Sequence, residues 1–107
     1  MFNPVPKNPY KRRKPTRRKR NNFSKKVREE ILERDDYRCK QCGMTGTEIH
    51  HVMPRSRNGR GIATNGLTLC ASCHRLVHRQ ADLLNGWIKH FKSFYGDGFW
   101  KDEWDRE

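Results

Sequence analysis

The sequence has no long apolar run and few apolar residues of any kind. Hydrophobic residues make up 33% of the 107 residues, slightly fewer than the 34% that carry a charge. No segment approaches the roughly 20 apolar residues that a membrane-spanning helix needs. Residues 1–6 also lack the apolar stretch of a secretory signal. We therefore expect no membrane partner, and a cytoplasmic location in a bacterial or phage-infected host cell or a nuclear one in a eukaryote.

Several common catalytic signatures are also absent. The chain has no HExxH motif, no phosphate-binding Walker loop and no serine-containing elbow, which argues against the enzyme classes that depend on them. A zinc deaminase needs His-x-Glu and a proline directly before a Cys-x-x-Cys pair. Here the order is Glu48-Ile49-His50, and no proline precedes either Cys-x-x-Cys pair, so this class is excluded.

Acidic residues are missing from residues 1–26, which hold 11 of the 24 Lys and Arg residues. The rest of the chain carries all 12 acidic residues and is nearly neutral, so the net charge of +12 comes mainly from the N-terminal segment. Prolines and repulsion between like charges favour disorder there. We therefore expect a disordered basic arm at residues 1–22, a folded domain at 23–95 and a C-terminal tail at 96–107.

Four cysteines form two Cys-x-x-Cys pairs, Cys39 with Cys42 and Cys70 with Cys73. Four cysteines allow two disulfides in three possible pairings. In a chain without a secretory signal, however, such pairs are typical of a tetrahedral zinc site. A small domain with a thin core also gains stability from a metal. We expect the four thiolates to bind a structural Zn²⁺.

The hydrophobic pattern predicts a small α+β domain. Ser24 is a favourable N-cap, Pro54 ends a strand, and Asn85-Gly86 is expected to end a helix. In chain order, the predicted segments are a helix from Ser24 to about Arg34, a strand at 47–53, a loop at 54–66, a strand at 67–69, a helix at 71–84 and an apolar segment at 87–94.

Histidines form a second group of possible ligands. His74 and His78 are four residues apart on a predicted helix, so both imidazoles lie on one face, about one turn apart, and can bind one ion. His50 would supply a third ligand from the first strand. By strand alternation, His51 points to the opposite face and is free to act as a base.

Taken in order, these residues resemble an HNH endonuclease of the zinc-bound kind common in phages. The resemblance covers roughly residues 25–80. It rests on Cys39, Cys42, His50, His51, Asn65-Gly66-Leu67-Thr68-Leu69, Cys70, Cys73, His74 and His78. It implies a ββα-metal (His-Me finger) fold with flanking helices, in which a two-stranded hairpin and the helix after it hold one divalent ion.

The resemblance also implies roles for individual residues. His50, His74 and His78 would bind the catalytic ion, for which imidazole ligands allow Mg²⁺, Mn²⁺, Ni²⁺ or Zn²⁺. Many family members have Asp where His50 stands here. His51 would be the general base that activates water. Asn65 would hold the hairpin loop and orient His51.

Basic residues of the arm and of the loop beside the site are candidate DNA contacts, because such residues bind phosphates without reading sequence. They are Lys11, Arg12, Arg13, Lys14, Arg17, Arg18, Lys19, Arg20, Arg55, Arg57 and Arg60. We predict a metal-dependent endonuclease that cuts double-stranded DNA with low intrinsic sequence specificity, directed by a protein partner where specificity is needed. Phage DNA processing or packaging, homing and restriction all fit. The alternative is a non-catalytic zinc-stabilised module that binds nucleic acid, or an interaction subunit of a DNA-processing complex.

Overall fold

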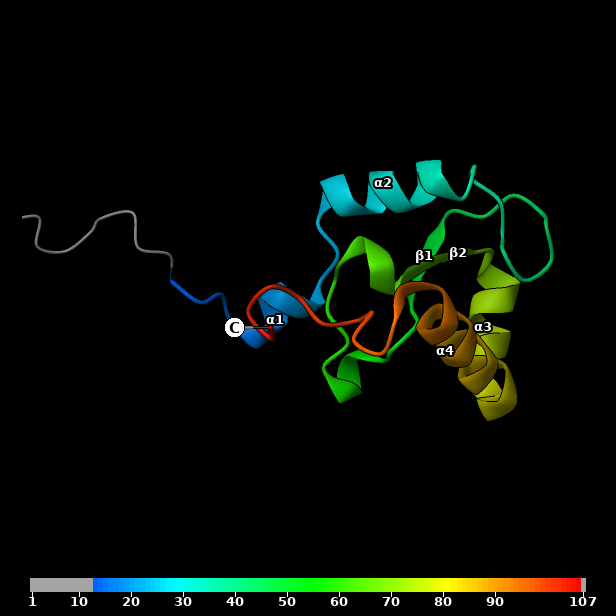
Figure 1. Ribbon diagram of the computed structural model, residues 1–107. Coiled ribbons are helices and arrows are strands. Elements are labelled where there is room, and N and C mark those ends of the chain that lie inside the picture. The colour runs from blue at the N-terminus through cyan, green and yellow to red at the C-terminus, as the bar shows by residue number, and fades with distance from the viewer. Residues whose placement is uncertain (1–12, 107) are drawn as a thin grey trace, which may run out of the picture.

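The computed structural model describes residues 13–106, and its central feature is a two-stranded hairpin followed by a helix (Figure 1). The helices and strands are, in chain order, α1 (Arg17–Asn21), α2 (Lys25–Arg34), β1 (Glu48–His51), β2 (Gly66–Leu69), α3 (Ala71–Arg79) and α4 (Ala81–Tyr95), with single 3-10 turns at Arg55–Arg57 and Ala63–Asn65. The small α+β class and the ββα arrangement predicted from the sequence are confirmed.

The hairpin places β1 antiparallel to β2, with Glu48 opposite Leu69 and His51 opposite Gly66. Every residue of β2 is buried, and Leu67 and Leu69 belong to the hydrophobic core. Helix α3 begins directly after β2, where the Cys70 thiol accepts a hydrogen bond from the main-chain N–H of Cys73. The end of β2 therefore fixes both the position and the direction of α3.

Helix α2 packs on the hairpin from the side opposite α3 and α4 (Figure 1). Its start is set by Ser24, whose hydroxyl accepts a hydrogen bond from the N–H of Val27, as the sequence predicts. Ile31 is fully buried against the hairpin. A side chain at Gly66 would lie 2.2 Å from Ile31 Cδ1, so the close approach of α2 to β2 requires glycine there.

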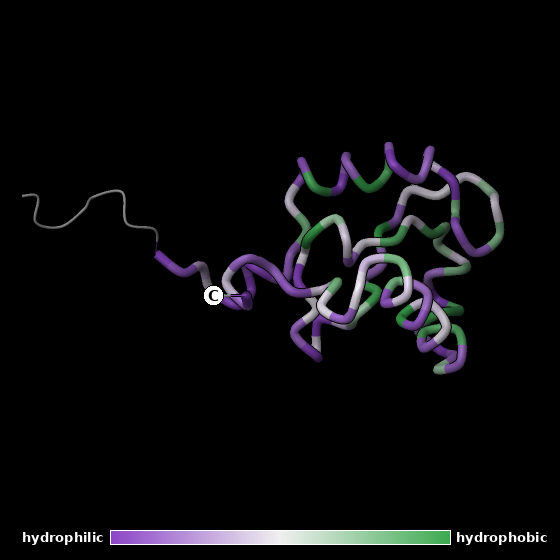
Figure 2. The backbone as a smooth tube through the Cα atoms, in the orientation of Figure 1, coloured by the Kyte–Doolittle hydropathy of each residue, from purple (hydrophilic) through white to green (hydrophobic). Residues whose placement is uncertain are grey.

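Helix α4 differs from the prediction. The helix expected to end at Asn85-Gly86 instead breaks at Gln80, and α4 runs through both residues to Tyr95. The cost of a helical glycine is only about 1 kcal/mol. It is offset by the apolar side chains that α4 packs against the core, which are Leu83, Leu84, Trp87, Ile88 and Phe91. Figure 2 shows hydrophobic segments in the hairpin, α3 and α4, with shorter ones in α2.

The two terminal segments also differ from the prediction. Of the arm predicted at 1–22, residues 1–12 lie outside the described residues, but 17–21 form helix α1, and Asn21 is only 3% exposed. The tail predicted from residue 96 folds back beside α1 (Figure 1), and Phe99 is 2% exposed in the core. Disorder fails as an expectation for 17–22 because Arg20 is paired with two carboxylates of the C-terminal segment, which neutralises part of the like-charge repulsion.

Within residues 13–106, no helix combines the length and the apolar character that crossing a membrane requires.

Candidate metal and catalytic centre

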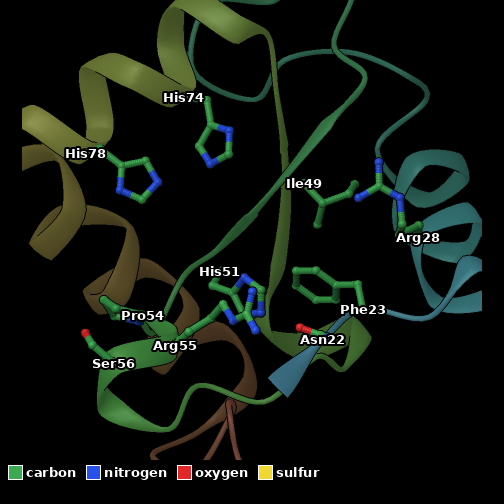
Figure 3. Close-up of a pocket in the computed structure, with 10 residues that line it drawn as sticks. All are labelled: Asn22, Phe23, Arg28, Ile49, His51, Pro54, Arg55, Ser56, His74 and His78. Carbon is green, nitrogen blue, oxygen red and sulfur yellow. The ribbon is translucent and has the colours of Figure 1, made fainter. Parts of the chain in front are cut away.

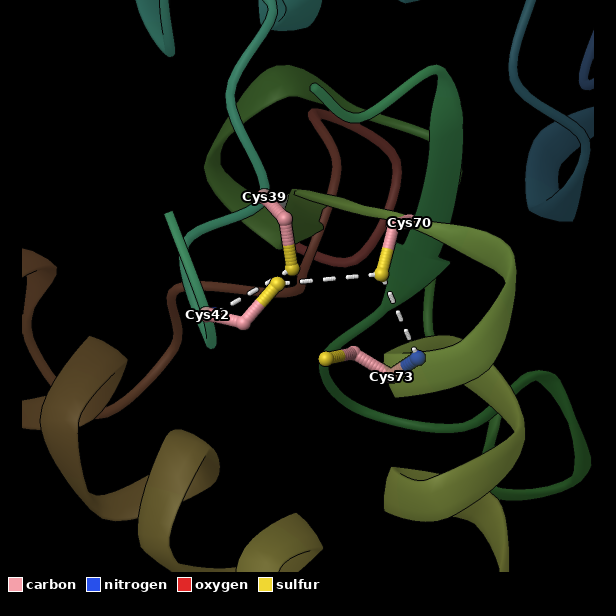
Figure 4. A group of neighbouring side chains, drawn as sticks. All are labelled: Cys39, Cys42, Cys70 and Cys73. Carbon is pink, nitrogen blue, oxygen red and sulfur yellow. Dashed lines mark hydrogen bonds between the residues drawn. The ribbon is translucent and has the colours of Figure 1, made fainter. Parts of the chain in front are cut away.

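The four cysteines converge at the end of the hairpin, although 27 residues separate the two pairs in the chain (Figure 4). All four are free thiols, and their sulfurs lie within 4.8 Å of one another. Cys42 Sγ and Cys70 Sγ are 3.8 Å apart. Tetrahedral zinc with bonds of about 2.3 Å places its sulfur ligands about 3.8 Å apart. The donor set and its spacing therefore fit a structural Zn²⁺.

The titration of these thiols agrees with that fit. Burial opposes ionisation of Cys39, but the main-chain N–H groups of Cys70, Cys42 and Gln41 lower its pKa to about 6. Burial and the neighbouring sulfurs raise the pKa of Cys73. Four thiolates cannot share so small a space unless a cation offsets their charge. A bound divalent ion would supply that charge.

Three imidazoles form a second cluster, about one turn further along α3 than the cysteines. His50 comes from β1, and His74 and His78 come from α3 (Figure 3 shows the last two). One nitrogen of each lies within 4.8 Å of the others. The ring centroids of His50 and His74 are 5.4 Å apart, and those of His74 and His78 are 4.9 Å apart. The structure thus brings together all three of the histidines predicted to bind the catalytic ion.

His50 is the most informative member of this cluster, which we call the histidine triad. It is 1% exposed, and neither of its ring nitrogens has a hydrogen-bond partner. Buried polar atoms without a partner are rare and point to a missing ligand. Burial, followed by the nearby His74 and His78, lowers the pKa of His50 to about 3. The imidazole is therefore neutral at physiological pH, which is the form that binds a metal.

Glu48 orients another member of the triad. Its Oε1 lies 2.8 Å from Nδ1 of His74. A carboxylate that accepts the Nδ1 proton leaves Nε2 as the ligand nitrogen, an arrangement common around metal-binding histidines. Sequence reasoning considered Glu48 only as a possible deaminase residue. Its position on the same strand face as His50 was the signal that could have found it.

His51 lies next to this cluster, in a pocket of about 690 Å³ that it shares with His74 and His78 (Figure 3). Its Nε2 is 2.6 Å from the main-chain carbonyl oxygen of Asn21, and its ring packs 4.2 Å from that of Phe23, centroid to centroid. Because a carbonyl only accepts, Nε2 carries the proton and Nδ1 keeps a free lone pair. Burial lowers the pKa of His51, although the bond to Asn21 opposes this shift.

Asn65 is fully buried at the end of the loop that joins the two strands. Its Oδ1 accepts from the N–H of Met53 at 2.7 Å, and its Nδ2 donates to the carbonyl oxygens of Met53 and Arg60. Its own carbonyl accepts from the N–H of Val52. The predicted role of holding the loop fits these bonds. These bonds connect Asn65 with Val52 and Met53, the two residues after His51, and Gly66, the residue after Asn65, lies opposite His51 in the hairpin.

The candidate DNA contacts fall into separate groups. Arg55 lines the pocket of His51, and it also lines an adjoining hollow together with Arg17 and Arg18. Arg57 is exposed on the same loop. Arg13, Lys14 and Lys19 line a hollow beside the C-terminal segment, and Lys11 and Arg12 lie outside the described residues.

Two of the predicted contacts need correction. The side chains of Arg20 and Arg60 are only 6% and 8% exposed, and both are paired with carboxylates. Neither is available to a phosphate. Conversely, Arg28 of α2 lines the pocket of His51, and sequence reasoning missed it. Its place one turn after the Ser24 cap gave no sign that α2 would border the site.

Comparison with known proteins agrees with this geometry. Residues 39–80 match the HNH endonuclease family. The chain is similar to anaredoxin from Nostoc sp. (strain PCC 7120 / SAG 25.82 / UTEX 2576), with 30% identity over 57 residues that cover 51% of this chain and 75% of that protein. It is also similar to the type IV methyl-directed restriction enzyme EcoKMcrA from Escherichia coli (strain K12), with 33% identity over 58 residues that cover 45% of this chain.

The similarity to EcoKMcrA spans 21% of that enzyme's length. The segment matched by the family contains both cysteine pairs, the histidine triad, His51 and Asn65. Sequence similarity and the two clusters of metal-ligand residues therefore lead to one conclusion: this chain belongs to the HNH endonuclease family.

Proposed function

We propose that this protein is a metal-dependent endonuclease that hydrolyses phosphodiester bonds in double-stranded DNA. The observation that carries the proposal is His50, a buried imidazole with both nitrogens unpaired, which faces two further histidines next to His51. A module that only bound nucleic acid would have no need for an unpaired histidine in its interior. A shared divalent ion gives His50 the partner that it lacks.

His50, His74 and His78 would hold this ion. When bound, it neutralises charge on the scissile phosphate and stabilises the departing oxygen. A set of three imidazoles accepts Zn²⁺ and Ni²⁺ as well as Mn²⁺ or Mg²⁺. Glu48 keeps the Nε2 lone pair of His74 turned toward the other two histidines, because it accepts the proton of Nδ1.

His51 is the general base in this proposal. The bond from its Nε2 to the carbonyl of Asn21 fixes the tautomer, so that Nδ1 accepts a proton from the attacking water. Burial favours the neutral imidazole, which is the form that can accept that proton. Phe23 packs against the ring and limits its rotation. A base held in this way is ready before the substrate arrives.

Arginines on two sides of the pocket support binding of a DNA strand across it. Arg28 comes from α2, and Arg55 comes from the loop after β1. The hollow that Arg55 shares with Arg17 and Arg18 continues this basic path toward the N-terminal segment. Contacts to phosphates fix position without reading sequence, so we infer low intrinsic specificity. A partner protein would then direct the cut.

The biological setting belongs to the proposal as well. Phage DNA processing or packaging requires cutting with little sequence preference, and restriction is the activity that EcoKMcrA's name states for that enzyme. A chain with one histidine triad cuts one strand at a time. Double-strand cleavage would therefore need two successive nicks or two copies of the chain.

The test is a plasmid-nicking assay with the zinc-loaded protein and added Mg²⁺, Mn²⁺, Ni²⁺ or Zn²⁺. His51→Ala is expected to lower the nicking rate by roughly 100-fold or more, the usual contribution of a general base. Its folding and DNA affinity should remain those of the wild type. His90→Ala is the matched control, since His90 lies on α4 among Trp87 and Phe94, outside the triad.

The rival function is a zinc-stabilised module that binds nucleic acid without cutting it. A wild-type protein that binds DNA but leaves plasmid intact with all four metals would support that rival. Equal nicking by His51→Ala and the wild type would instead show that another group activates water.

A further inference from the structure

A chain of contacts links the C-terminal segment to His51. The main-chain carbonyl of Asn21 accepts from His51, and the side chain of the same residue is buried. Asn21 Oδ1 accepts a hydrogen bond from Arg60 Nη1 at 2.8 Å. Arg60 in turn donates to both carboxylate oxygens of Asp105, each at 2.9 Å. Asn21 is therefore held on one side by Arg60 and holds His51 on the other.

Arg20, the neighbour of Asn21, strengthens this link. It donates to both oxygens of Asp102, at 2.8 and 2.7 Å, and to Asp105 at 2.8 Å. Its main-chain carbonyl accepts from the N–H of Gly61 at 2.8 Å. The side chains of Arg20 and Arg60 are almost fully buried in these pairs. We call Arg20, Arg60, Asp102 and Asp105 the arginine clasp.

The clasp supplies order that α1 does not have by itself. This helix has five residues, and isolated helices shorter than roughly 12 residues are marginal in water. Without the clasp, α1 would be a segment rich in like charges, and the carbonyl of Asn21 would have no fixed position. The side chains of Arg20 and Arg60 are also too deeply buried to bind DNA.

We propose that the clasp positions the general base, with Arg60 and Asp105 as positioning residues that act on His51 through Asn21. This inference rests on the assignment of His51 in the proposed function. A displacement of about 1 Å at a reacting group can lower a rate by about 100-fold. The clasp touches neither the histidine triad nor the pocket lined by Arg28, so it acts on the base and not on metal ligands.

A purely structural role would have a different signature. Buried ion pairs often add little net stability, yet removing one partner destabilises the fold. A structural clasp would lower the melting temperature and leave the kcat of the folded protein unchanged. A positioning clasp lowers kcat under conditions in which the protein is fully folded, while KM for DNA changes little.

The experiment compares Arg60→Gln with Arg106→Gln in the full-length, zinc-loaded protein. Arg106 is an exposed arginine of the same C-terminal segment, and its side chain donates to the main-chain carbonyls of Gly98 and Lys101. The two variants lose the same charge. We expect Arg60→Gln to lower kcat for nicking by 10- to 100-fold and Arg106→Gln to change it less than twofold. Arg60→Lys, which keeps a donor and the charge, should recover part of the loss.

A second readout does not depend on cutting. Nitrogen-15 NMR of the imidazoles at pH 8 should show His51 of the wild type as one tautomer, with the proton on Nε2. Arg60→Gln should show a mixture of tautomers, and Arg106→Gln should match the wild type. If kcat and the His51 signal of Arg60→Gln match those of Arg106→Gln, the inference is overturned.

Arg60→Gln has a milder substitute in case it does not fold. Asp105→Asn removes one charge of the clasp, and Asp97→Asn is its matched control because the Asp97 side chain is 90% exposed. Loss of kcat in Asp105→Asn alone supports the positioning role, and equal rates in both variants overturn it. Failure of the proposed function is a separate result: the wild type would then leave plasmid intact with all four metals. Equal cutting by His51→Ala and the wild type would remove only the assignment of the base. In both cases the NMR comparison would still test the clasp.

Discussion

Glu48 Oε1 and His74 Nδ1 lie 2.8 Å apart, across the gap between β1 and α3. The pair joins the first strand to the helix at the level of the histidine triad. His74 therefore cannot rotate freely, and its Nε2 is left as the nitrogen available to bind an ion. The contact therefore helps to fix the orientation of one imidazole of the histidine triad.

Glu48→Ala is expected to weaken binding of the proposed catalytic ion by 10- to 100-fold. This is the usual effect of removing a carboxylate that orients a metal-binding histidine. Glu48→Gln keeps a hydrogen-bond acceptor and should fall between Glu48→Ala and the wild type. Calorimetric titration of the zinc-loaded protein with Mn²⁺ or Ni²⁺ measures this directly. Unchanged affinity in Glu48→Ala would mean that the rotation of His74 is fixed by other contacts.

Removal of the structural zinc is expected to unfold the protein. The cysteine cluster joins the segment before β1 to the start of α3, and binding of zinc to four cysteines contributes on the order of 10 kcal/mol to folding. Circular dichroism during titration with a strong chelator measures the loss of helix, and added Zn²⁺ should restore it. A metal-free protein with an unchanged spectrum would contradict this.

The nicking rate is expected to rise with pH, with the midpoint of the rise below the ordinary histidine pKa of about 6.5. Burial lowers the pKa of His51, and a bound cation nearby shifts it in the same direction. Its neutral form, the one that accepts a proton, is thus present above a pKa lower than the ordinary value of about 6.5. Single-turnover rates at saturating metal measure the profile. A rise centred above pH 7 would assign the titration to another group.

Arg17 and Arg18 are expected to contribute to DNA binding, and Arg20 is not. The double variant Arg17→Gln with Arg18→Gln should weaken DNA binding. It should also reduce the steepness of the plot of log affinity against log salt concentration by up to about 2, because fewer counterions are released on binding when two phosphate contacts are lost. Its melting temperature should stay close to that of the wild type. Fluorescence anisotropy at several salt concentrations measures the slope.

Arg20→Gln is the contrasting variant. It removes an arginine from the same helix but breaks three hydrogen bonds to Asp102 and Asp105. Breaking buried pairs of this kind costs about 3–5 kcal/mol, so this variant should melt at a clearly lower temperature. A stable Arg20→Gln protein with weakened DNA binding would reverse the assignment of these arginines.

The sequence was sufficient for the parts of the fold that depend on local spacing. Two Cys-x-x-Cys pairs, a His pair four residues apart and an alternating strand each specify their own geometry, and the hairpin brings them together. Ser24 marked the start of α2 for the same reason. The roles of the triad and of His51 remain predictions, but the structure places these residues where such roles require them.

Features that depend on distant pairing were not predictable. Arg20 has the same local surroundings as Arg17 and Arg18, and its partner Asp102 is 82 residues away. The high charge of the N-terminal segment therefore predicted disorder for all of residues 1–22. The continuity of α4 through Asn85-Gly86 likewise depends on packing against the core, which outweighs local propensity.

The pairing of Arg20 and Arg60 with Asp102 and Asp105 also has a consequence for the order in which the protein folds during translation. Both arginines leave the ribosome well before Asp102 and Asp105 have been synthesised. All residues of the cysteine cluster and the triad are already present in a chain that ends at residue 80, whereas Asp102 and Asp105 are not. If the clasp positions His51 as proposed, a growing chain that has bound its metals would still be a poor nuclease until residue 105 is free to fold.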